Sequence, residues 1–534
     1  MAGKATVGER GDAAYSTSRA PRINHFDVPI TNRMNSEQAY AELVRLSREE
    51  SVLSSCVDLL DWDQEVYMPP AGTKHRSEQM ALLAGLVHDR ATNPRYDELL
   101  SVVEASPLVA DPESPEAVNV RELRRGYDRE RRIPRRLVEE MARVTLRAAK
   151  VWTKARKEND FKSFAPWLDK VLVLAREEAD AVGHDGNRYD ALLDDYEPGM
   201  TAERVSTLFT RLRADLVPLV DELRGQAAAT DVLDGTFDLY AQRVFTDSTV
   251  AAIGFDFKGG RVDLAQHPFC TTLGRGDVRI GTRYYKNDVT RGIFACLHEA
   301  GHALYEQGLD AAHYGTPMGE AVSIGVHESQ SRLWENLVGR SEGFWLHFYP
   351  QLQNTFRDAF HDGSLETFRR SINRVEPHLI RVEADEVTYN LHVVIRFELE
   401  RALLDGDLAA ADLPGAWNDL YQNYLGITPP DDRTGCLQDI HWAEGLIGYF
   451  PTYTLGNVYA AQIFAAAERA IGPLEDAFAV GEFGELRRWL ADNIHRHGMR
   501  YRAEELIARV TGSGPDPLAL IENLSTRYGM KASR

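Results

Sequence analysis

The stretch FACLHEAGHALYEQG, residues 294–308, places His298 and His302 four positions apart, with Glu299 directly after the first of them. Alanine and leucine recur in it and proline does not occur, so it predicts a helix. Positions i and i+4 lie on one face of a helix, where two imidazoles can converge on one cation. The spacing is the H-E-x-x-H pattern, in which the histidines bind zinc and the glutamate acts as general base. Because roughly a few per cent of comparable chains contain this pattern by chance, its surroundings must decide.

Two glycines bear on this predicted helix. Gly308 stands where a C-terminal glycine would end it. Gly301 lies inside it, where glycine costs about 1 kcal/mol relative to alanine. We therefore expect another group to approach the backbone closely at Gly301, either a packed helix or a substrate.

A metal held by two histidines needs a third protein ligand. Spacing leaves four downstream carboxylates open: Asp310, Glu320, Glu328 and Glu335. Glu328 lies in IGVHESQSRLWENL, residues 324–337, where polar neighbours surround it in an otherwise apolar predicted helix. This crowding favours Glu328 as a site residue. The alternative is a surface ion pair between Glu328 and Arg332 at i+4.

Composition narrows the class of partner. The 534 residues are 43% hydrophobic and 27% charged, as in ordinary globular proteins, and no apolar run approaches the ~20 residues of a membrane span. The formal net charge of -20 disfavours binding to nucleic acids or anionic membranes, both of which require basic surfaces. We therefore expect neither a nucleic-acid partner nor a membrane partner.

Cysteine usage and the N-terminus bear on the compartment. The four cysteines show no C-x-x-C spacing: Cys56, Cys270, Cys296 and Cys436. Neither a disulfide framework nor a thiolate zinc site is indicated. The first residues also lack the apolar core of a secretory signal. These features predict a cytoplasmic protein.

The hydrophobic pattern predicts a mainly α fold. Helical periodicity dominates residues 36–244 and returns after the 294–308 helix, whereas residues 250–290 alternate and are rich in glycine, threonine and tyrosine. We expect a small β-sheet there, next to the H-E-x-x-H helix. Residues 1–35 are expected to be a flexible N-terminal extension, and residues 36–534 one large helical body.

Seven ordered motifs carry a resemblance to a known family: WDQEVYMPPAG (62–72), HPF (267–269), DVRIGT (277–282), HEAGH (298–302), HESQ (327–330), IRVEAD (380–385) and GCLQDIHW (435–442). With them the chain resembles the M32 metallocarboxypeptidases, the thermostable carboxypeptidase Taq family, from about residue 37 to 530. The resemblance implies a gluzincin-like helical body with a deep active-site groove. It also implies a zinc-dependent carboxypeptidase of broad specificity that is a homodimer and acts on peptides.

The resemblance further implies roles for individual residues. His298, His302 and Glu328 become the metal ligands, and Glu299 becomes the base that deprotonates water. Zn²⁺ is the expected ion, with Co²⁺ or another divalent ion as alternatives. Two other functions stay open: a zinc oligopeptidase or dipeptidase that uses the same site, and a non-catalytic helical binding protein.

An exopeptidase also needs a cation that binds the terminal carboxylate of its substrate, and arginine suits this because its planar fork forms two parallel hydrogen bonds. In LIRVEADEVTYNLHVVIRFELE, residues 379–400, Arg381, Asp385 and His392 recur at helical spacing as a polar stripe. The alternative is an ion pair between Arg381 and Asp385. The IRVEAD motif favours carboxylate binding by Arg381.

Further polar residues are weaker candidates. His441, with Tyr449 and Tyr453, is expected to donate hydrogen bonds to the tetrahedral oxyanion, although aromatic packing explains each tyrosine equally well. In the predicted sheet region, His267, Asp277 and Arg279 are expected to position substrate or to orient the metal ligands.

Overall fold

A computed structural model of the chain describes residues 34–224, 233, 235–360 and 363–529. The chain divides into Met1–Asn35 and a compact unit, Ser36–Arg534. The predicted flexible extension, residues 1–35, lies almost entirely outside the described residues. No described helix combines the length and the apolar character that a bilayer span requires.

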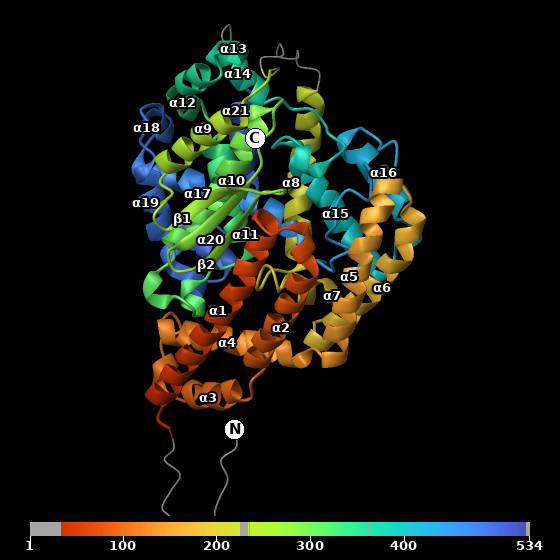
Figure 1. Cartoon of the computed structure of the whole chain (residues 1–534), viewed down its shortest axis with the longest axis vertical. Helices are drawn as coiled ribbons and strands as arrows, with labels where there is room; N and C mark the ends of the chain where they lie inside the picture. The colour runs from red at the N-terminus through yellow and green to blue at the C-terminus, as the bar shows by residue number, and fades with distance from the viewer. Residues whose placement is uncertain (1–33, 225–232, 234, 361–362, 530–534) are drawn as a thin grey trace, which may run out of the picture. The chain divides into compact units, whose positions relative to one another are not determined.

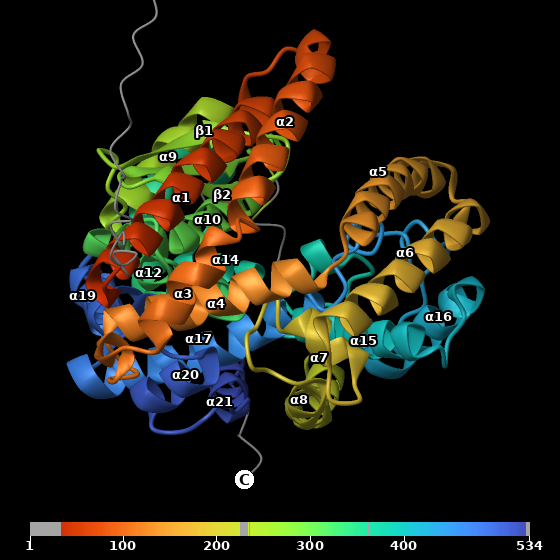
Figure 2. The same ribbon diagram turned by 90° about the horizontal axis from the view of Figure 1, so that it is seen from below.

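The unit Ser36–Arg534 is mainly helical, as the sequence predicts, and its first half is built largely from helical hairpins (Figures 1 and 2). α1 packs along α2, and α5 packs along α6. α1 also passes beside the sheet, against strand β2. The helices before the sheet are α1 (Ser36–Val66), α2 (Thr73–Ala91), α3 (Arg95–Glu104), α4 (Pro115–Arg132), α5 (Arg135–Glu158), α6 (Phe161–Val182), α7 (Arg188–Leu193), α8 (Ala202–Leu223) and α9 (Leu239–Ala252), with short turns η1 (Pro70–Gly72) and η2 (Pro107–Val109).

The predicted sheet is confirmed within residues 250–290. Its strands are β1 (Gly260–Leu264), β2 (Phe269–Gly274) and β3 (Asp277–Thr282), in the order β1-β3-β2. β1 runs parallel to β3, and β2 and β3 form an antiparallel hairpin. Val278 and Ile280 of β3 are buried, on the side where the sheet meets the H-E-x-x-H helix. The sheet therefore lies directly beside that helix.

Three helices form the frame of the site. α10 (Val289–Gly308) carries the H-E-x-x-H residues, and the Asp288 side chain accepts hydrogen bonds from its first backbone N–H groups. α11 (Ile324–Arg332) carries Glu328 and continues as a π-helical segment, η5 (Leu333–Val338). α17 (Phe450–Ile471) is apolar on almost all sides and is correspondingly buried.

Two glycines let α11 lie very close to both neighbours. A Cβ at Gly301 of α10 would lie 2.5 Å from the carbonyl oxygen of Gln330, and one at Gly456 of α17 would lie 2.5 Å from Cγ of Glu328. Either contact is shorter than packed atoms allow, so only glycine fits. The close approach expected at Gly301 is therefore made by a packed helix.

The helical spacing predicted for residues 379–400 is wrong for the first residues of this stretch. Arg381 lies in a short 3₁₀ turn, η6 (Arg381–Glu383), and α15 begins only at Thr388. The carboxylate of Asp385 accepts hydrogen bonds from the backbone N–H groups of Val387 and Thr388, so it starts the helix instead of lying within it. Arg381 and Asp385 are consequently not stacked at helical spacing.

The remaining elements complete the second half of the chain, where α15, α20 and α21 pack on α17. The helices are α12 (Glu342–Thr355), α13 (Arg357–Phe360), α14 (Leu365–Ile372), α15 (Thr388–Asp405), α16 (Leu413–Leu425), α18 (Leu474–Ala479), α19 (Gly484–Asn493), α20 (Ala503–Thr511) and α21 (Leu518–Arg527), with turns η3 (Ala311–His313), η4 (Pro317–Gly319), η7 (Ala410–Asp412) and η8 (His495–Arg500).

Candidate active site

The structure brings His298, His302 and Glu328 together. Oε2 of Glu328 lies 3.7 Å from Nε2 of His298 and 3.5 Å from Nε2 of His302. One atom from each of the three residues can be chosen so that all lie within 4.8 Å of one another. Two imidazole nitrogens and one carboxylate oxygen are a donor set that zinc binds, and three protein ligands leave a position open for water or substrate. The geometry therefore fits a catalytic metal.

The outward-facing nitrogens of both histidines are held by other side chains. Nδ1 of His298 lies 2.8 Å from the carboxylate of Glu335, and Nδ1 of His302 contacts Nδ1 of His327. His327 in turn lies 2.8 Å from the carboxylate of Glu306. Such partners fix the orientation of a metal-binding imidazole and leave its other nitrogen free for the ion. The two Nε2 atoms are thus directed toward Glu328.

Arg332, on α11, contributes a positive charge beside this cluster. Its guanidinium donates to Glu328 at 2.7 Å and to Glu335 at 3.2 Å. Burial opposes ionisation of Glu328, but Arg332 and the two histidines hold the pKa of this carboxyl well below its usual range. Burial also disfavours the charged form of His298, yet Glu328 and Glu335 raise its pKa. The negative charge of Glu328 and Glu335 therefore exceeds the positive charge of Arg332. This excess of negative charge favours the binding of a cation between the two histidines.

Glu299 lies one residue after His298 and is buried, with 7% of its surface exposed. Burial raises its pKa to about 7, against the opposing effect of His298. A carboxyl group in that range can both accept and release a proton near neutral pH. The position and the environment of Glu299 suit a general base.

A second buried polar group surrounds Arg381, of which only 5% is exposed. Its guanidinium donates through Nε and one terminal nitrogen to Asp439, at 3.1 and 2.8 Å, and through the other to the Tyr389 hydroxyl at 2.9 Å. Arg396, which is fully buried, donates to the second oxygen of Asp439 at 2.7 Å. The alternative pair of Arg381 with Asp385 is not what the structure shows. One carboxylate thus serves two guanidinium groups.

This second group adjoins the metal cluster through Tyr389. The guanidinium of Arg332 lies 4.3 Å from the centre of the Tyr389 ring, and the hydroxyl of the same tyrosine accepts the hydrogen bond from Arg381. Arg332 itself contacts both Glu328 and Glu335, so it links the two groups of residues.

His441, Tyr449 and Tyr453 lie together at the junction of the two groups. Nε2 of His441 lies 3.0 Å from the Tyr453 hydroxyl, and the Arg381 guanidinium stands over the Tyr453 ring at 4.8 Å. Burial, reinforced by the negative charge of Glu328, raises the pKa of Tyr449 to about 12. Tyr449 therefore keeps its proton and lies within electrostatic reach of Glu328.

The residues predicted from the sheet region make their contacts with other residues. Arg279 is paired with Asp277 through two hydrogen bonds of 2.8 Å, and its guanidinium stacks on Trp62 of α1 at 4.0 Å. His267 is exposed, and among the described residues no hydrogen bond or ion pair joins it to the metal cluster. The structure thus gives Arg279 and Asp277 a contact that ties α1 to the sheet, and substrate binding by any of the three stays a prediction.

Several residues that complete the site were not singled out from the sequence. Glu306, Asp439 and Arg396 are separated in the chain from the residues they hold, so no local spacing reveals them. Glu335 had been considered as a ligand and instead contacts the far nitrogen of His298. In the sequence, these residues are visible only as charged residues within apolar predicted helices. Such residues indicate a buried polar network, but they do not show which residues pair with one another.

The chain is similar to characterised proteins over nearly its full length. The profile of the family described as "Carboxypeptidase Taq (M32) metallopeptidase" matches residues 42–528. "Thermostable carboxypeptidase 1" of Thermus thermophilus is 49% identical over 506 residues, which are 93% of this chain and 99% of that protein. "Carboxypeptidase 1" of Bacillus subtilis is 37% identical over 91% of this chain and 97% of that protein. The crystal structure of the M32 carboxypeptidase from Deinococcus radiodurans R1 superposes with a TM-score of 0.89 at 43% identity, covering 92% of this chain and 99% of that one.

Proposed function

The chain belongs to the carboxypeptidase Taq (M32) metallopeptidases and is a hydrolase that acts on peptide bonds. From this premise we propose the following roles for its residues. His298, His302 and Glu328 hold the catalytic metal ion, and Glu299 is the general base. The observation that carries this proposal is the convergence of the three ligand atoms, together with the buried carboxyl of Glu299, which lies within electrostatic reach of His298 and Glu328.

The donor set favours zinc. Imidazole and carboxylate ligands with one open position are typical of catalytic zinc sites, and they also accept Co²⁺ or another divalent ion. When bound, the ion supplies a Lewis acid that polarises the scissile carbonyl and acidifies water. Glu299 takes the proton from that water and delivers it to the leaving amine. Glu335 and His327 keep the two imidazoles in the orientation that the ion needs.

Arg381 binds the terminal carboxylate of the substrate. Asp439 neutralises only one of the two buried guanidinium groups, Arg381 and Arg396. Burial and the nearby arginines lower the pKa of His392 well below its usual value, and burial lowers that of His441 to about 4, so neither histidine adds charge at neutral pH. The group therefore carries an excess positive charge in a dry environment, which a substrate carboxylate would neutralise. This charge, next to the metal cluster, favours an exopeptidase.

His441 and Tyr449 stabilise the oxyanion. The hydroxyl of Tyr449 makes no hydrogen bond to another described side chain, and its high pKa keeps it a donor. His441 is fixed by stacking on Phe450 at 4.4 Å and by its contact with Tyr453. A donor in a water-poor site strengthens as negative charge develops on the substrate oxygen.

The carboxylate anchor makes a testable prediction. Amidation of the C-terminus of a peptide removes the charge that Arg381 recognises, so kcat/KM should fall about ten- to a hundredfold. Arg381→Ala should lower kcat/KM on the free acid by a similar factor, and change the already poor rate on the amide much less, because both alterations remove one interaction. Arg396 still pairs with Asp439 in this variant, so no carboxylate is left unpaired.

The control is Arg279→Ala, which removes a guanidinium outside this group. It should leave the ratio of acid to amide rates unchanged. Additive losses for Arg381→Ala and amidation would show that the carboxylate is bound elsewhere. Mass spectrometry of the digests identifies the class: single residues lost from the C-terminus support the carboxypeptidase, whereas internal cuts or released dipeptides would favour the oligopeptidase or dipeptidase.

We also propose a homodimer in a reducing cytoplasm. The homodimer rests on the resemblance of the motifs, and light scattering of the purified protein tests it directly. The cytoplasm is supported by the cysteines, which are free in the described part of the chain: Cys56, Cys270, Cys296 and Cys436.

A further inference from the structure

A fully buried carboxyl on α15, that of Glu400, has no part in the roles proposed above. Its two oxygens accept three hydrogen bonds, from the Trp442 indole at 2.9 Å, the Gly448 backbone N–H at 3.3 Å and the Tyr189 hydroxyl at 2.6 Å. Burial raises the pKa of Glu400 to about 7, and the three hydrogen bonds oppose this effect. Among the described residues no ion pair involves Glu400, so its contacts are those with neutral groups.

Two of these three contacts are made by one loop, residues 441–449, which is built from turns and precedes α17. The loop begins at His441 and ends at Tyr449, the two residues proposed to stabilise the oxyanion and called the oxyanion donors below. Trp442 directly follows the first of them, and Gly448 directly precedes the second. The carboxylate on α15 therefore holds the loop at both ends, next to each oxyanion donor.

Gly448 brings its end of the loop close to α7. Its φ is +91°, and a Cβ there would lie 3.1 Å from the backbone nitrogen of Leu193, so glycine is the residue that fits. The backbone N–H of Gly448 and the hydroxyl of Tyr189, on α7, donate to the same oxygen, Oε2 of Glu400. The loop, α7 and α15 are thus joined at one carboxylate.

The two oxyanion donors depend on where the backbone places them. The ring of Tyr449 lies 5.1 Å from that of Tyr196, and the ring of His441 lies 4.4 Å from that of Phe450. These contacts restrict the rotation of each ring, whereas the two ends of the loop determine where each side chain begins. A donor stabilises an oxyanion from about 2.7–3.1 Å, so a small displacement of either loop end weakens the interaction.

We propose that Glu400 is a positioning residue for the oxyanion donors, because it holds both ends of the loop that carries them. A carboxylate suits this task, since its two oxygens only accept hydrogen bonds and together serve three donating groups. Glu400 acts through Trp442 and Gly448. The inference rests on the proposed function, which assigns the oxyanion to His441 and Tyr449.

Glu400→Gln keeps the shape of the side chain but turns an N–H group toward one of the three donating groups. We expect kcat on an N-acylated dipeptide to fall about ten- to a hundredfold and KM to change less than about twofold. The reason is that the oxyanion donors act in the transition state, whereas Arg381 and the metal also bind the ground state. Zinc content should be unchanged. The rates are measured at about pH 8.5, above the pKa of Glu299 and of Glu400.

A second variant, Trp442→Phe, keeps the carboxylate and removes the donating group next to His441. Its kcat should fall about three- to tenfold, again with KM little changed. It decides the question if Glu400→Gln does not fold. Unchanged kcat in folded Glu400→Gln or in Trp442→Phe would overturn the proposal, as would a rise in KM without a fall in kcat.

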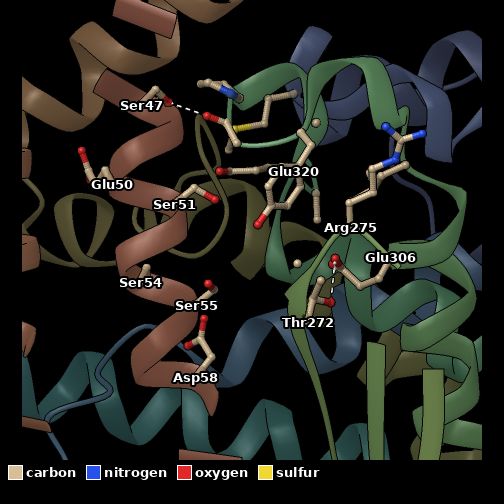
Figure 3. Close-up of a pocket in the computed structure, with 18 of the residues that line it drawn as sticks. Ser47, Glu50, Ser51, Ser54, Ser55, Asp58, Thr272, Arg275, Glu306 and Glu320 are labelled. Atoms are coloured by element: carbon tan, nitrogen blue, oxygen red, sulfur yellow. Dashed lines mark hydrogen bonds between the residues drawn. The ribbon is translucent and has the colours of Figure 1, made fainter. Parts of the chain in front are cut away.

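Two controls separate positioning from a general loss of stability. Tyr189→Phe takes one hydrogen bond from the same carboxylate but none from the loop. Glu50→Gln makes the same chemical change in a carboxyl that also accepts from a tyrosine hydroxyl, that of Tyr96, at 3.0 Å. Glu50 lines the cavity beside α1, whose lining includes no metal ligand and neither oxyanion donor (Figure 3). Both controls should keep kcat within about twofold of the unmodified enzyme, and a loss equal to that of Glu400→Gln in either would overturn the proposal.

A comparison of combined variants shows whether Glu400 acts through the oxyanion donors. In the background Tyr449→Phe/His441→Asn, which lacks both, Glu400→Gln should change kcat less than about twofold. A loss that multiplies in full in this background would overturn the proposal. Failure of the proposed function is distinguishable: if Tyr449→Phe and His441→Asn each keep full kcat, the oxyanion assignment is wrong and the inference falls with it.

Discussion

Glu299→Gln should lower kcat by about a hundredfold to ten-thousandfold while the protein keeps its full complement of zinc. Glutamine has nearly the shape of glutamate but accepts no proton, so the variant loses the transfer from water and the delivery to the leaving amine. The metal should stay, because the proposed ligand set is His298, His302 and Glu328. Steady-state rates and elemental analysis of the same dialysed sample measure both quantities.

Two controls make this comparison specific. Glu306→Gln changes another buried carboxylate of α10 that contacts His327 and not the scissile bond, so its kcat should fall far less. The melting temperature of Glu299→Gln should match or exceed that of the unmodified protein, because an amide does not carry the cost of a buried charge. Turnover close to that of the unmodified enzyme in fully zinc-loaded Glu299→Gln would rule out Glu299 as the base.

Glu328→Ala should weaken zinc binding by more than the roughly 10–100-fold that loss of an outer hydrogen-bond partner costs. The change removes a direct donor and one of the two carboxylates that offset the charge of Arg332, so the remaining positive charge close to the two histidines repels the ion further. Competition with a chromogenic chelator gives the affinity, and activity should follow the zinc content of each sample.

The competing carboxylates provide the controls for Glu328. Glu335→Ala should reduce affinity less than Glu328→Ala, because Glu335 orients His298 from its far nitrogen. Glu320→Ala should leave affinity unchanged, because Glu320 lines the cavity beside α1. If Glu335→Ala or Glu320→Ala lost zinc more readily than Glu328→Ala, the ligand assignment would be wrong.

The helix face of His298 and His302 was predictable from spacing, because residues four apart meet within one helix whatever surrounds them. The small sheet was predictable for a similar reason, since alternation over residues 250–290 is local. Glu328 was favoured by its polar neighbours, and its approach to the histidines depends on Gly456 of α17, which lies far along the chain. Glu328 was chosen as the third ligand because of the motif resemblance, and periodicity did not distinguish it from the other carboxylates.

The residues around Arg381 show where the prediction from sequence was wrong. Arg381 was placed on a helix with Asp385, but Asp385 satisfies the free N–H groups at the start of α15, which ends the helix short of Arg381. The partner of Arg381 is Asp439, which also holds Arg396. Pairings between residues so distant in the chain are set by tertiary packing, and a single sequence carries no local signal for them.

The central claim is that His298, His302 and Glu328 together hold the catalytic ion, and anomalous diffraction at the zinc edge from zinc-loaded crystals tests it most directly. The account predicts that the strongest anomalous peak lies between the two Nε2 atoms and the carboxylate of Glu328, and that it disappears in Glu328→Ala crystals. A strongest peak at any other place, or none beside the two histidines in a fully active sample, would contradict it.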